Sequence, residues 1–314
     1  MLKIYSLVSG LLMFFLISGC GDEPAAYSVQ GEPEFSIGVV ADVQYADRDD
    51  IPKYNSYYRP SLGKLTECVE TFNRRDLEFA IQLGDLVDIH LESYDKVLPI
   101  WEKIRCDKYH VIGNHDLSDT ADYDTLLNRL SMDSNYYDFK RGGWRFIVID
   151  TNEISVFSQP EGSEKYELAR SILDNLKEQG SPKAVPWNAT VSDEQLDWVD
   201  ALLSEADNAG EPVVIFGHHP YVSRQESLTA LNNDKVVQVF ESHPSFKAYI
   251  CGHDHDGGYV YQNGRHYLTL NGLMSTPDTN AYAIMDFYPG RIVVNGFGRV
   301  DSREMNITDF ADNE

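Results

Sequence analysis

The chain has 314 residues, and its 26 Lys and Arg residues against 50 Asp and Glu residues give a net charge of −24. The length suits one large α/β domain or two smaller ones and permits a sizeable hydrophobic core. So negative a protein repels nucleic acid and anionic lipid surfaces, which argues against nucleic acid as a partner.

The N-terminal residues 1–19 have the layout of a signal peptide. Lys3 precedes the apolar run Leu7–Ile17, which is short for a membrane span of roughly 20 residues. The sequence Ile17-Ser-Gly-Cys20 resembles the lipobox of bacterial lipoproteins, in which the preceding peptide is removed and the Cys is lipidated. We therefore expect a lipid on Cys20 and a location in a bacterial cell envelope, outside the cytoplasm, with membrane contact through the lipid. An uncleaved anchor and an ordinary signal peptide are the alternatives.

Residues 20–34 predict a flexible tether, because the segment after Cys20 is polar and rich in Gly, Pro and Glu. The other cysteines are Cys68, Cys106 and Cys251, an odd number at wide spacing, and they indicate no disulfide framework.

From Phe35 onward, apolar runs typical of strands alternate with amphipathic stretches, which predicts an α/β domain over residues 35–300. Helices are expected at 61–74, 94–104, 123–130 and 192–206, the last opening with a Ser192-x-x-Gln195 capping box. Hairpins are expected at 136–149, 259–270 and 282–294. Residues 151–191 resemble an inserted loop or lid, and residues 301–314 an acidic tail.

Five of the apolar runs each end in a side chain that can bind a metal ion: Asp42, Asp85, Asn114, His218 and His253. Residues at the carboxyl ends of neighbouring strands meet in one crevice of an α/β sheet. Each motif alone has a simpler explanation, since Asp and Asn after a strand are common in turns and helix caps. Their occurrence together, in this order, predicts a single metal centre.

The set of motifs resembles the calcineurin-like metallophosphoesterases. The matching blocks are Asp42-x-Gln44, Gly84-Asp85, Gly113-Asn114-His115-Asp116, His218-x-Pro220 and Gly252-His253-x-His255. The resemblance extends from about Phe35 to Phe297 and implies a four-layer αββα sandwich of two mixed sheets flanked by helices. It also implies two metal ions bridged by Asp85, one held by Asp42, Gln44, Asp85 and His255, the other by Asp85, Asn114, His218 and His253.

Gln44 narrows the resemblance to one branch, because most members have His there. Purple acid phosphatases in addition carry Tyr where this chain has Asp88. The manganese-dependent ADP-ribose/CDP-alcohol diphosphatases use Gln, and the chain resembles them again at 41–47, 57–62, 195–198 and 252–259. It departs from them at Asn188-Ala189, where that branch tends to have Asn-Gly. A carboxamide oxygen favours Mn²⁺ or Mg²⁺ over Zn²⁺, so Mn²⁺ is expected, with Mg²⁺, Fe²⁺ and Zn²⁺ as alternatives.

The resemblance implies hydrolysis of the phosphoanhydride of small nucleoside diphosphate derivatives such as ADP-ribose and CDP-alcohols. Two metals roughly 3.5–4 Å apart would share the attacking hydroxide, which leaves His115 free to act as general acid. Residues that could orient imidazoles are Asp88, Asp116 and Asp256. Substrate contacts are expected from Arg59, Tyr58, His219 and Tyr259, although Arg59 could equally cap a helix and the tyrosines could be buried.

Two other functions fit the same residues. A phosphodiesterase or phosphomonoesterase of broader specificity is one, because the fold does not fix the substrate. A noncatalytic lipoprotein that binds metal is the other, and His115 argues against it because a purely structural site would not need that residue.

Overall fold

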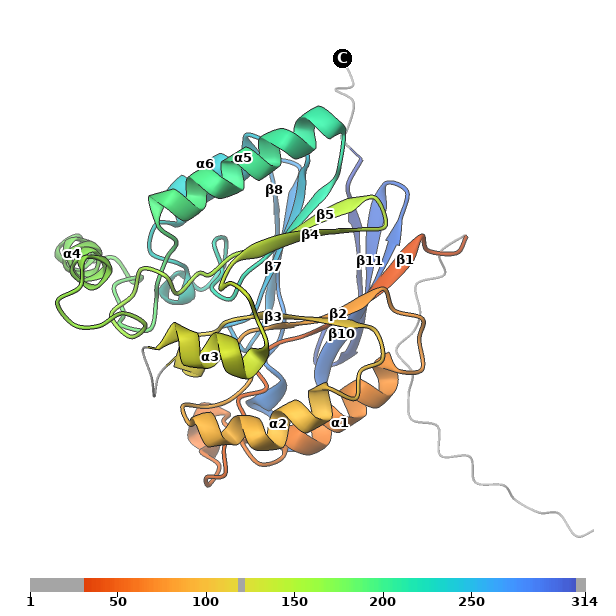
Figure 1. The fold of residues 1–314 in the computed structure, drawn as a ribbon, viewed down its shortest axis with the longest axis horizontal. Helices are drawn as coiled ribbons and strands as arrows, with labels where there is room; N and C mark the ends of the chain where they lie inside the picture. The colour runs from red at the N-terminus through yellow and green to blue at the C-terminus, as the bar shows by residue number, and fades with distance from the viewer. Residues whose placement is uncertain (1–30, 118–121, 309–314) are drawn as a thin grey trace, which may run out of the picture.

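The computed structural model describes residues 31–117 and 122–308. Two six-stranded sheets pack face to face, and helices cover their outer faces (Figure 1). The predicted four-layer sandwich of two mixed sheets is therefore confirmed. The expected signal peptide, Cys20, most of the tether and the last six residues lie outside the described residues.

The first sheet combines three parallel strands with three antiparallel ones. In spatial order it contains β12 (Arg303–Asn306), β11 (Arg291–Gly298), β10 (Ala281–Tyr288), β1 (Phe35–Val40), β2 (Phe79–Leu83) and β3 (Asp107–Val111). The parallel strands β1, β2 and β3 all end at the same edge, where their following loops meet.

The second sheet has four parallel strands between two antiparallel edge strands. In spatial order it contains β4 (Tyr137–Arg141), β5 (Trp144–Val148), β6 (Val213–Phe216), β7 (Phe246–Cys251), β9 (Arg265–Thr269) and β8 (Gly258–Gln262). The predicted hairpins correspond to β4–β5, β8–β9 and β10–β11.

Successive residues of a strand face opposite sides of the sheet, so one set of side chains packs between the two sheets and the other set packs against the helices. Ile37 and Val39 of β1 face Phe146 and Phe216 of the other sheet in the central core, while Val40 contacts the helical layer, as a two-residue period requires. The helices α1 (Ser61–Phe72), α2 (Tyr94–Trp101) and α3 (Tyr123–Leu130) cover the first sheet, and α5 (Asp193–Ala209) and α6 (Asn233–Glu241) cover the second. No helix in the described ranges is long and apolar enough to cross a membrane.

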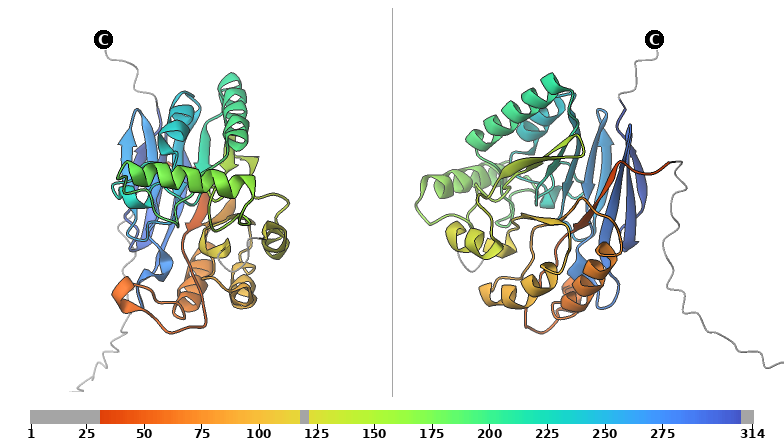
Figure 2. Two further views of the ribbon diagram at one scale, coloured as in Figure 1. Left: turned by 90° about the vertical axis from the view of Figure 1, so that its left-hand side faces the viewer. Right: turned by 45° about the vertical axis from the view of Figure 1, so that its right-hand side comes forward.

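The segment 151–191 contains α4 (Glu164–Glu178), which runs along the outside of the molecule (Figure 2). Both ends of the segment are tied together by the bridge between Ile154 and Thr190. Short 3₁₀ helices occur at Pro52–Tyr54, Leu91–Ser93, His115–Leu117, Glu226–Leu228 and Leu273–Ser275.

Two elements were missed by the sequence analysis. Helix α6 carries Val236, Val237 and Val239, β-branched residues that favour strands, but Val236 and Phe240, four residues apart, pack against the second sheet. Strand β12 corrects the assignment of residues 301–314 to a tail, because Arg303–Asn306 pair with β11 and Met305 is fully buried. The acidic composition of the segment concealed this short alternation.

Candidate metal centre

The candidate metal centre lies where the ends of the two sheets meet. Asp42 follows β1, Asp85 follows β2 and His218 follows β6, and one ligand atom from each lies within 4.8 Å of the others. All three side chains are buried. The two carboxylates thus come from the first sheet and the imidazole from the second.

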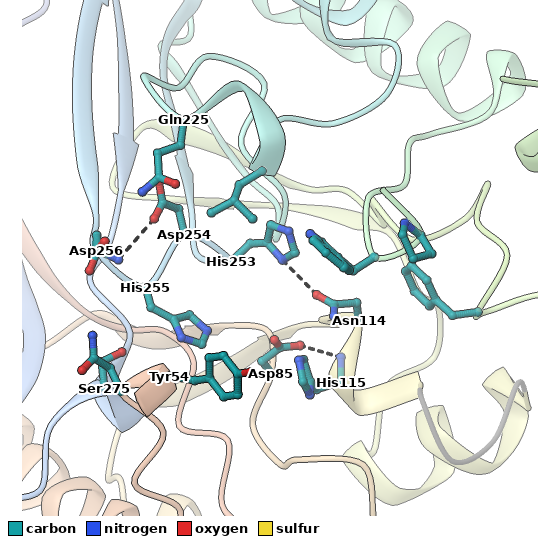
Figure 3. A pocket seen from close by; sticks show the side chains of 15 residues that line it. Tyr54, Asp85, Asn114, His115, Gln225, His253, Asp254, His255, Asp256 and Ser275 are labelled. Atoms are coloured by element: carbon teal, nitrogen blue, oxygen red, sulfur yellow. Dashed lines mark hydrogen bonds between the residues drawn. The ribbon is translucent and has the colours of Figure 1, made fainter. Parts of the chain in front are cut away.

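Three further predicted ligands join this group. Asn114 Oδ1 lies 3.1 Å from His218 Nε2 and 2.9 Å from His253 Nδ1, a contact visible in Figure 3. On the other side, His255 Nε2 lies 3.6 Å from Asp42 Oδ1. The structure therefore brings ligands from five loops around one small volume.

The hydrogen bonds of these side chains fit bound divalent cations. His218 donates from Nδ1 to the carbonyl of Leu83 at 2.8 Å, which leaves Nε2 directed at Asp85 Oδ2, 3.3 Å away. A metal-binding imidazole is held in this way by its second nitrogen. Within the described ranges, Asp42 Oδ2 and His253 Nε2 are buried without a hydrogen-bond partner. Buried polar atoms of this kind are costly unless another group satisfies them, and a cation would satisfy the carboxylate.

Gln44 lies directly against the expected bridging residue. Its Nε2 donates to Asp85 Oδ2 at 2.8 Å, and the side chain is buried. A half-turn of the amide exchanges its nitrogen and oxygen, so Gln44 can present an oxygen ligand at the same position.

The backbone around the centre is strained. Asp42, Gln44, Asp85 and His253 have φ angles of 51°, 41°, 54° and 69°, a left-handed region that costs non-glycine residues on the order of 1–3 kcal/mol each. The packing also requires glycine, because a β-carbon at Gly113 would lie 2.1 Å from Asp85 Oδ1. The strained φ angles and the close packing at Gly113 indicate that these loops adopt the conformation that brings the candidate ligands together.

Asp116 braces the loops that follow β2 and β3. Its carboxylate accepts hydrogen bonds from the backbone amides of Asp85, Leu86 and Gly113 at 2.9–3.0 Å and from the hydroxyl of Tyr94 at 2.7 Å. Burial and the nearby Asp85 charge raise its pKa to about 6, against these hydrogen bonds. The expectation that Asp116 orients an imidazole is wrong, since its carboxylate accepts hydrogen bonds from backbone amides and from the Tyr94 hydroxyl instead.

His115 is positioned by Asp88. Its Nδ1 lies 2.6 Å from Asp88 Oδ1, while its backbone amide donates to Asp85 Oδ1 at 2.8 Å. Burial lowers the pKa of His115, but the charge of Asp85 and the hydrogen bond to Asp88 outweigh it and raise the pKa to about 9. The imidazole therefore carries a proton beside the candidate metal centre.

Asp85 and His218 form a second pair of groups whose charges shift each other's pKa. Burial raises the pKa of Asp85, yet the charges of His218 and His115 hold it well below its usual value. Burial lowers the pKa of His218, and Asp85 more than compensates, raising it to about 9. A cation bound here would displace the His218 proton, because metal ligands bind in their deprotonated form.

A cavity of about 740 Å³ opens from these ligands to the surface (Figure 3). One wall is formed by Asp85, Asn114, His115, His253 and His255. Much of the rest of the lining is apolar and comprises Phe157, Pro186, Trp187 and Leu228, together with Tyr54, which lies beside His255 and Asp85 (Figure 3). Cavities of this size, mostly apolar with a few convergent polar groups, are typical of small-molecule sites.

Residues 35–257 match the family of calcineurin-like phosphoesterases. The chain belongs to the calcineurin-like phosphoesterase family. It is 32% identical to the manganese-dependent ADP-ribose/CDP-alcohol diphosphatase of Danio rerio, over 86% of this chain and 97% of that protein, and 33% identical to the protein of the same name from Arabidopsis thaliana, over 88% and 98%.

The fold of this calcineurin-like phosphoesterase is also similar to solved structures. A dimetal phosphatase from Danio rerio has a TM-score of 0.81 at 31% identity and covers 88% of this chain and 100% of that one. A purple acid phosphatase from yellow lupin shares the fold, with a TM-score of 0.54 at 13% identity, over 87% of this chain and 52% of that one. The protein is thus a hydrolase of a family whose members use divalent metals.

Several residues expected to contact substrate in this phosphoesterase do not line the cavity. Arg59 forms ion pairs with Asp47 and Asp49 at 2.7 and 2.9 Å. Tyr58 is buried beneath the guanidinium of Arg48, 4.5 Å from its ring centre. The substrate roles of Arg59 and Tyr58 are therefore corrected to roles in holding the loop after β1.

His219 and Tyr259 also lie elsewhere. His219 is buried and bonded to Thr151 and to the carbonyl of Trp187, and burial lowers its pKa to about 3. Tyr259 lines a neighbouring cleft instead of the cavity. His219 thus supports the cavity wall from behind.

Asp256 lines the cavity, but its side chain pairs with Arg299 at 3.7 Å instead of orienting an imidazole. The residues missed by the sequence analysis are the aromatic ones, Tyr54 and Trp187, which lie in loops with no periodic pattern. No sequence signal marked either residue, because their exposure, 67% and 46%, becomes known only from the structure.

Proposed function

We propose that the protein hydrolyses the phosphoanhydride bond of small nucleoside diphosphate derivatives, with ADP-ribose and CDP-alcohols as the representative substrates. The cavity carries this proposal, because it brings the metal ligands, His115 and the exposed aromatic rings of Tyr54 and Trp187 into one space. The names of the similar proteins from Danio rerio and Arabidopsis thaliana support it.

Two divalent ions, with Mn²⁺ preferred, would be held by this chain's own side chains. Asp42, Gln44 and His255 would serve one ion, Asn114, His218 and His253 the other, and Asp85 would contact both. When bound, such ions acidify a water molecule and offset the negative charge of the phosphoryl group. Carboxylate and amide oxygens around the first ion suit Mn²⁺ better than softer metals.

His115 would protonate the leaving oxygen. It lines the cavity beside Asp85, and Asp88 holds its Nδ1, so the other ring nitrogen is the one free to act on substrate (Figure 3). A general acid must lie within hydrogen-bond reach of the leaving group, which the shared wall of His115 and the ligands allows.

The exposed rings of Tyr54 and Trp187 would stack on the nucleobase. Both line the cavity, and stacking of a base on an aromatic ring contributes roughly 1–3 kcal/mol. Replacing Trp187 by Ala should raise KM for ADP-ribose about tenfold or more and leave KM for nitrophenyl phosphate unchanged. Tyr261→Ala is the matched control, because this tyrosine is 45% exposed and lies outside the cavity.

One assay separates this function from the alternatives. The protein is incubated with ADP-ribose, CDP-choline, a cyclic nucleotide and a phosphomonoester, first with Mn²⁺ and then with a chelator. Preferential cleavage of the first two, abolished by chelator, supports the proposal. Equal cleavage of all four indicates a broader phosphoesterase, and no cleavage of any indicates a noncatalytic metal-binding protein.

We also propose that the hydrolase is anchored through lipidated Cys20 in a bacterial cell envelope, outside the cytoplasm. The support is the lipobox-like sequence Ile17–Cys20 that follows the apolar run. Small nucleotides, and not nucleic acid, would then be its partners, in keeping with the net charge of −24.

A further inference from the structure

A cleft lined by three arginines lies beside the candidate metal centre. Arg224, Arg299 and Arg303 line a space of about 410 Å³, together with the Gly257-Gly258 turn and Asn271. The whole chain has only 26 Lys and Arg residues against 50 acidic ones. Asp256 and Asp301 also line the cleft, but they lie 3.7 and 3.9 Å from Arg299 and Arg303. The three guanidinium groups therefore outnumber the carboxylates, and the cleft favours negative charge.

The cleft adjoins the cavity of the candidate metal centre. Asp256 lines both spaces, and a smaller cavity of about 230 Å³, lined by Arg224, Gln225 and Asp254, lies between them. Gln225, Asp254 and Asp256 lie together on one side of the cavity of the candidate metal centre (Figure 3). Arg299 also donates to the carbonyl of His255 at 3.2 Å, so the cleft begins directly behind a candidate metal ligand.

Arg299 donates to the carbonyls of Gly272 and His255, whereas Arg224 and Arg303 keep donors available for a ligand. Arg224 is exposed, with no ion pair or hydrogen bond to another side chain among residues 31–117 and 122–308. Arg303 stacks on the ring of Tyr259 at 4.5 Å, and its Nε atom is buried without a hydrogen-bond partner in the same ranges. Its ion pair with Asp301 spans 3.9 Å to a carboxylate that is mostly exposed, and such pairs contribute little.

We propose that this cleft binds a second anionic group of the substrate, a phosphate or a carboxylate remote from the bond that is hydrolysed. Guanidinium groups bind both anions through paired, charge-assisted hydrogen bonds. The inference rests on the proposed function, because it takes the cavity to hold a nucleoside diphosphate derivative. It narrows the substrate class to derivatives that carry an additional negative charge.

Two substrate pairs test the cleft, each differing by one charged group. UDP-glucuronate and UDP-glucose differ by a carboxylate, and ADP-ribose 2′-phosphate and ADP-ribose differ by a phosphate. KM is measured for all four with the Mn²⁺-loaded protein, with Arg224→Gln and with Arg75→Gln. Arg75 is the matched control, because it is an exposed arginine just beyond α1 and does not line the cleft.

The Arg224→Gln variant should raise KM about tenfold for the charged member of one pair or both, as loss of a charge-assisted hydrogen bond predicts. The neutral member should change less than twofold, and Arg75→Gln should change neither. An equal effect of Arg224→Gln on both members, or no effect on either pair, overturns the proposal.

Failure of the proposed function is recognised separately. If the native protein hydrolyses none of the four compounds, the proposed hydrolysis fails, and the same ratios are then taken from Kd by titration calorimetry. A selective loss of affinity of Arg224→Gln for a charged member still supports the cleft. Identical Kd values for the variant and the native protein with both pairs overturn it.

Discussion

Nδ1 of His115 lies 2.6 Å from Oδ1 of Asp88, and the other oxygen of Asp88 accepts a hydrogen bond from Arg48 at 2.8 Å. Asp88 is buried, whereas its two partners, His115 and Arg48, are partly exposed. This chain of three residues fixes the orientation of the imidazole at the edge of the cavity. The ring of His115 is held by Asp88, and His115 is therefore not among the side chains expected to bind a metal ion.

The first prediction concerns the leaving group. His115→Ala should slow cleavage of ADP-ribose by about 10²–10⁴-fold, the usual effect of losing a general acid. It should slow an aryl phosphodiester with a nitrophenolate leaving group far less, because that group departs without protonation. Asp88→Asn should show the same selectivity at about 10–100-fold, the typical cost of losing an orienting partner. Rates on both substrates, with metal content measured alongside, provide the check.

Equal rate losses of His115→Ala on both leaving groups, with metals retained, would show that His115 positions substrate instead of donating a proton. Asp85→Asn is the control with the opposite pattern. It should lose metal and all activities together, because Asp85 lies between both groups of ligands.

The second prediction concerns metal preference. Gln44→His replaces an amide beside Asp85 with an imidazole, which should shift binding away from Mn²⁺ and toward Zn²⁺ or Fe²⁺. Titration calorimetry with each metal measures the shift directly, without reference to activity. Superimposable titrations of the variant and the native protein would mean that Gln44 is not a ligand.

The positions of the candidate ligands could be predicted because each directly follows an apolar strand. Asp42, Asp85 and His218 come at the ends of β1, β2 and β6, and parallel strands bring such residues to one edge. This information is local in the sequence, so short motifs were sufficient to place the site, whereas the two-sheet sandwich was implied by the family resemblance.

The aromatic residues that line the cavity could not be predicted in the same way. Trp187 and Tyr54 lie far apart in the chain, in loops without periodicity, and only the packed fold brings them to one cavity. Asp116 resembled a partner for an imidazole because of its place in the motif Gly113–Asp116. Its actual partners are backbone amides and the Tyr94 hydroxyl. Hydrogen bonds to the backbone cannot be recognised from the residue types of a motif.

The third prediction tests this bracing role. Asp116→Asn leaves one carbonyl oxygen where the two carboxylate oxygens accept several backbone amides, and each unsatisfied buried amide costs about 1–3 kcal/mol. The variant should therefore lower the free energy of unfolding by at least about that amount and weaken metal binding. Denaturant unfolding in the presence of chelator isolates the first effect. An unchanged unfolding midpoint would exclude the bracing role.

The fourth prediction concerns pH and a histidine remote from the site. His243 contacts Asp207 at 2.6 Å through Nδ1 and Asp200 at 3.0 Å through Nε2. Both partners are acceptors, so both ring nitrogens donate and the ring is cationic. Burial lowers its pKa, but the hydrogen bonds to the two carboxylates raise it above the usual value.

Because the folded-state pKa of His243 is raised, the stabilisation is complete below its unfolded pKa of about 6.5 and is lost as the pH rises through the folded pKa. His243→Gln should therefore lower the Tm more at pH 6 than at pH 9. The Tm of both proteins is measured across this range. A constant difference in Tm would contradict the assigned charge on His243.

The last prediction joins the expected lipid anchor to the direction of β1. The strand begins at Phe35, next to the tether, and runs toward Asp42, so the chain enters the domain at the end of the sheet opposite the metal centre. A lipid on Cys20 would thus attach the protein at the end of the sheet remote from the cavity, which leaves the cavity accessible to dissolved nucleotides.

Cys20→Ser should release the protein from the membrane fraction and leave its activity intact, because residues 20–34 are expected to serve only as a tether. Each lipid CH₂ buried in the bilayer contributes about 0.8 kcal/mol, whereas a chain with a net charge of −24 gains no electrostatic attraction to anionic lipid. Fractionation after a high-salt wash measures the release. Cys106→Ser is the matched control and should stay in the membrane fraction, since Cys106 lies within the folded domain. Retention of Cys20→Ser after the wash would contradict lipidation as the anchor and would favour the alternative of an uncleaved anchor formed by the apolar run Leu7–Ile17.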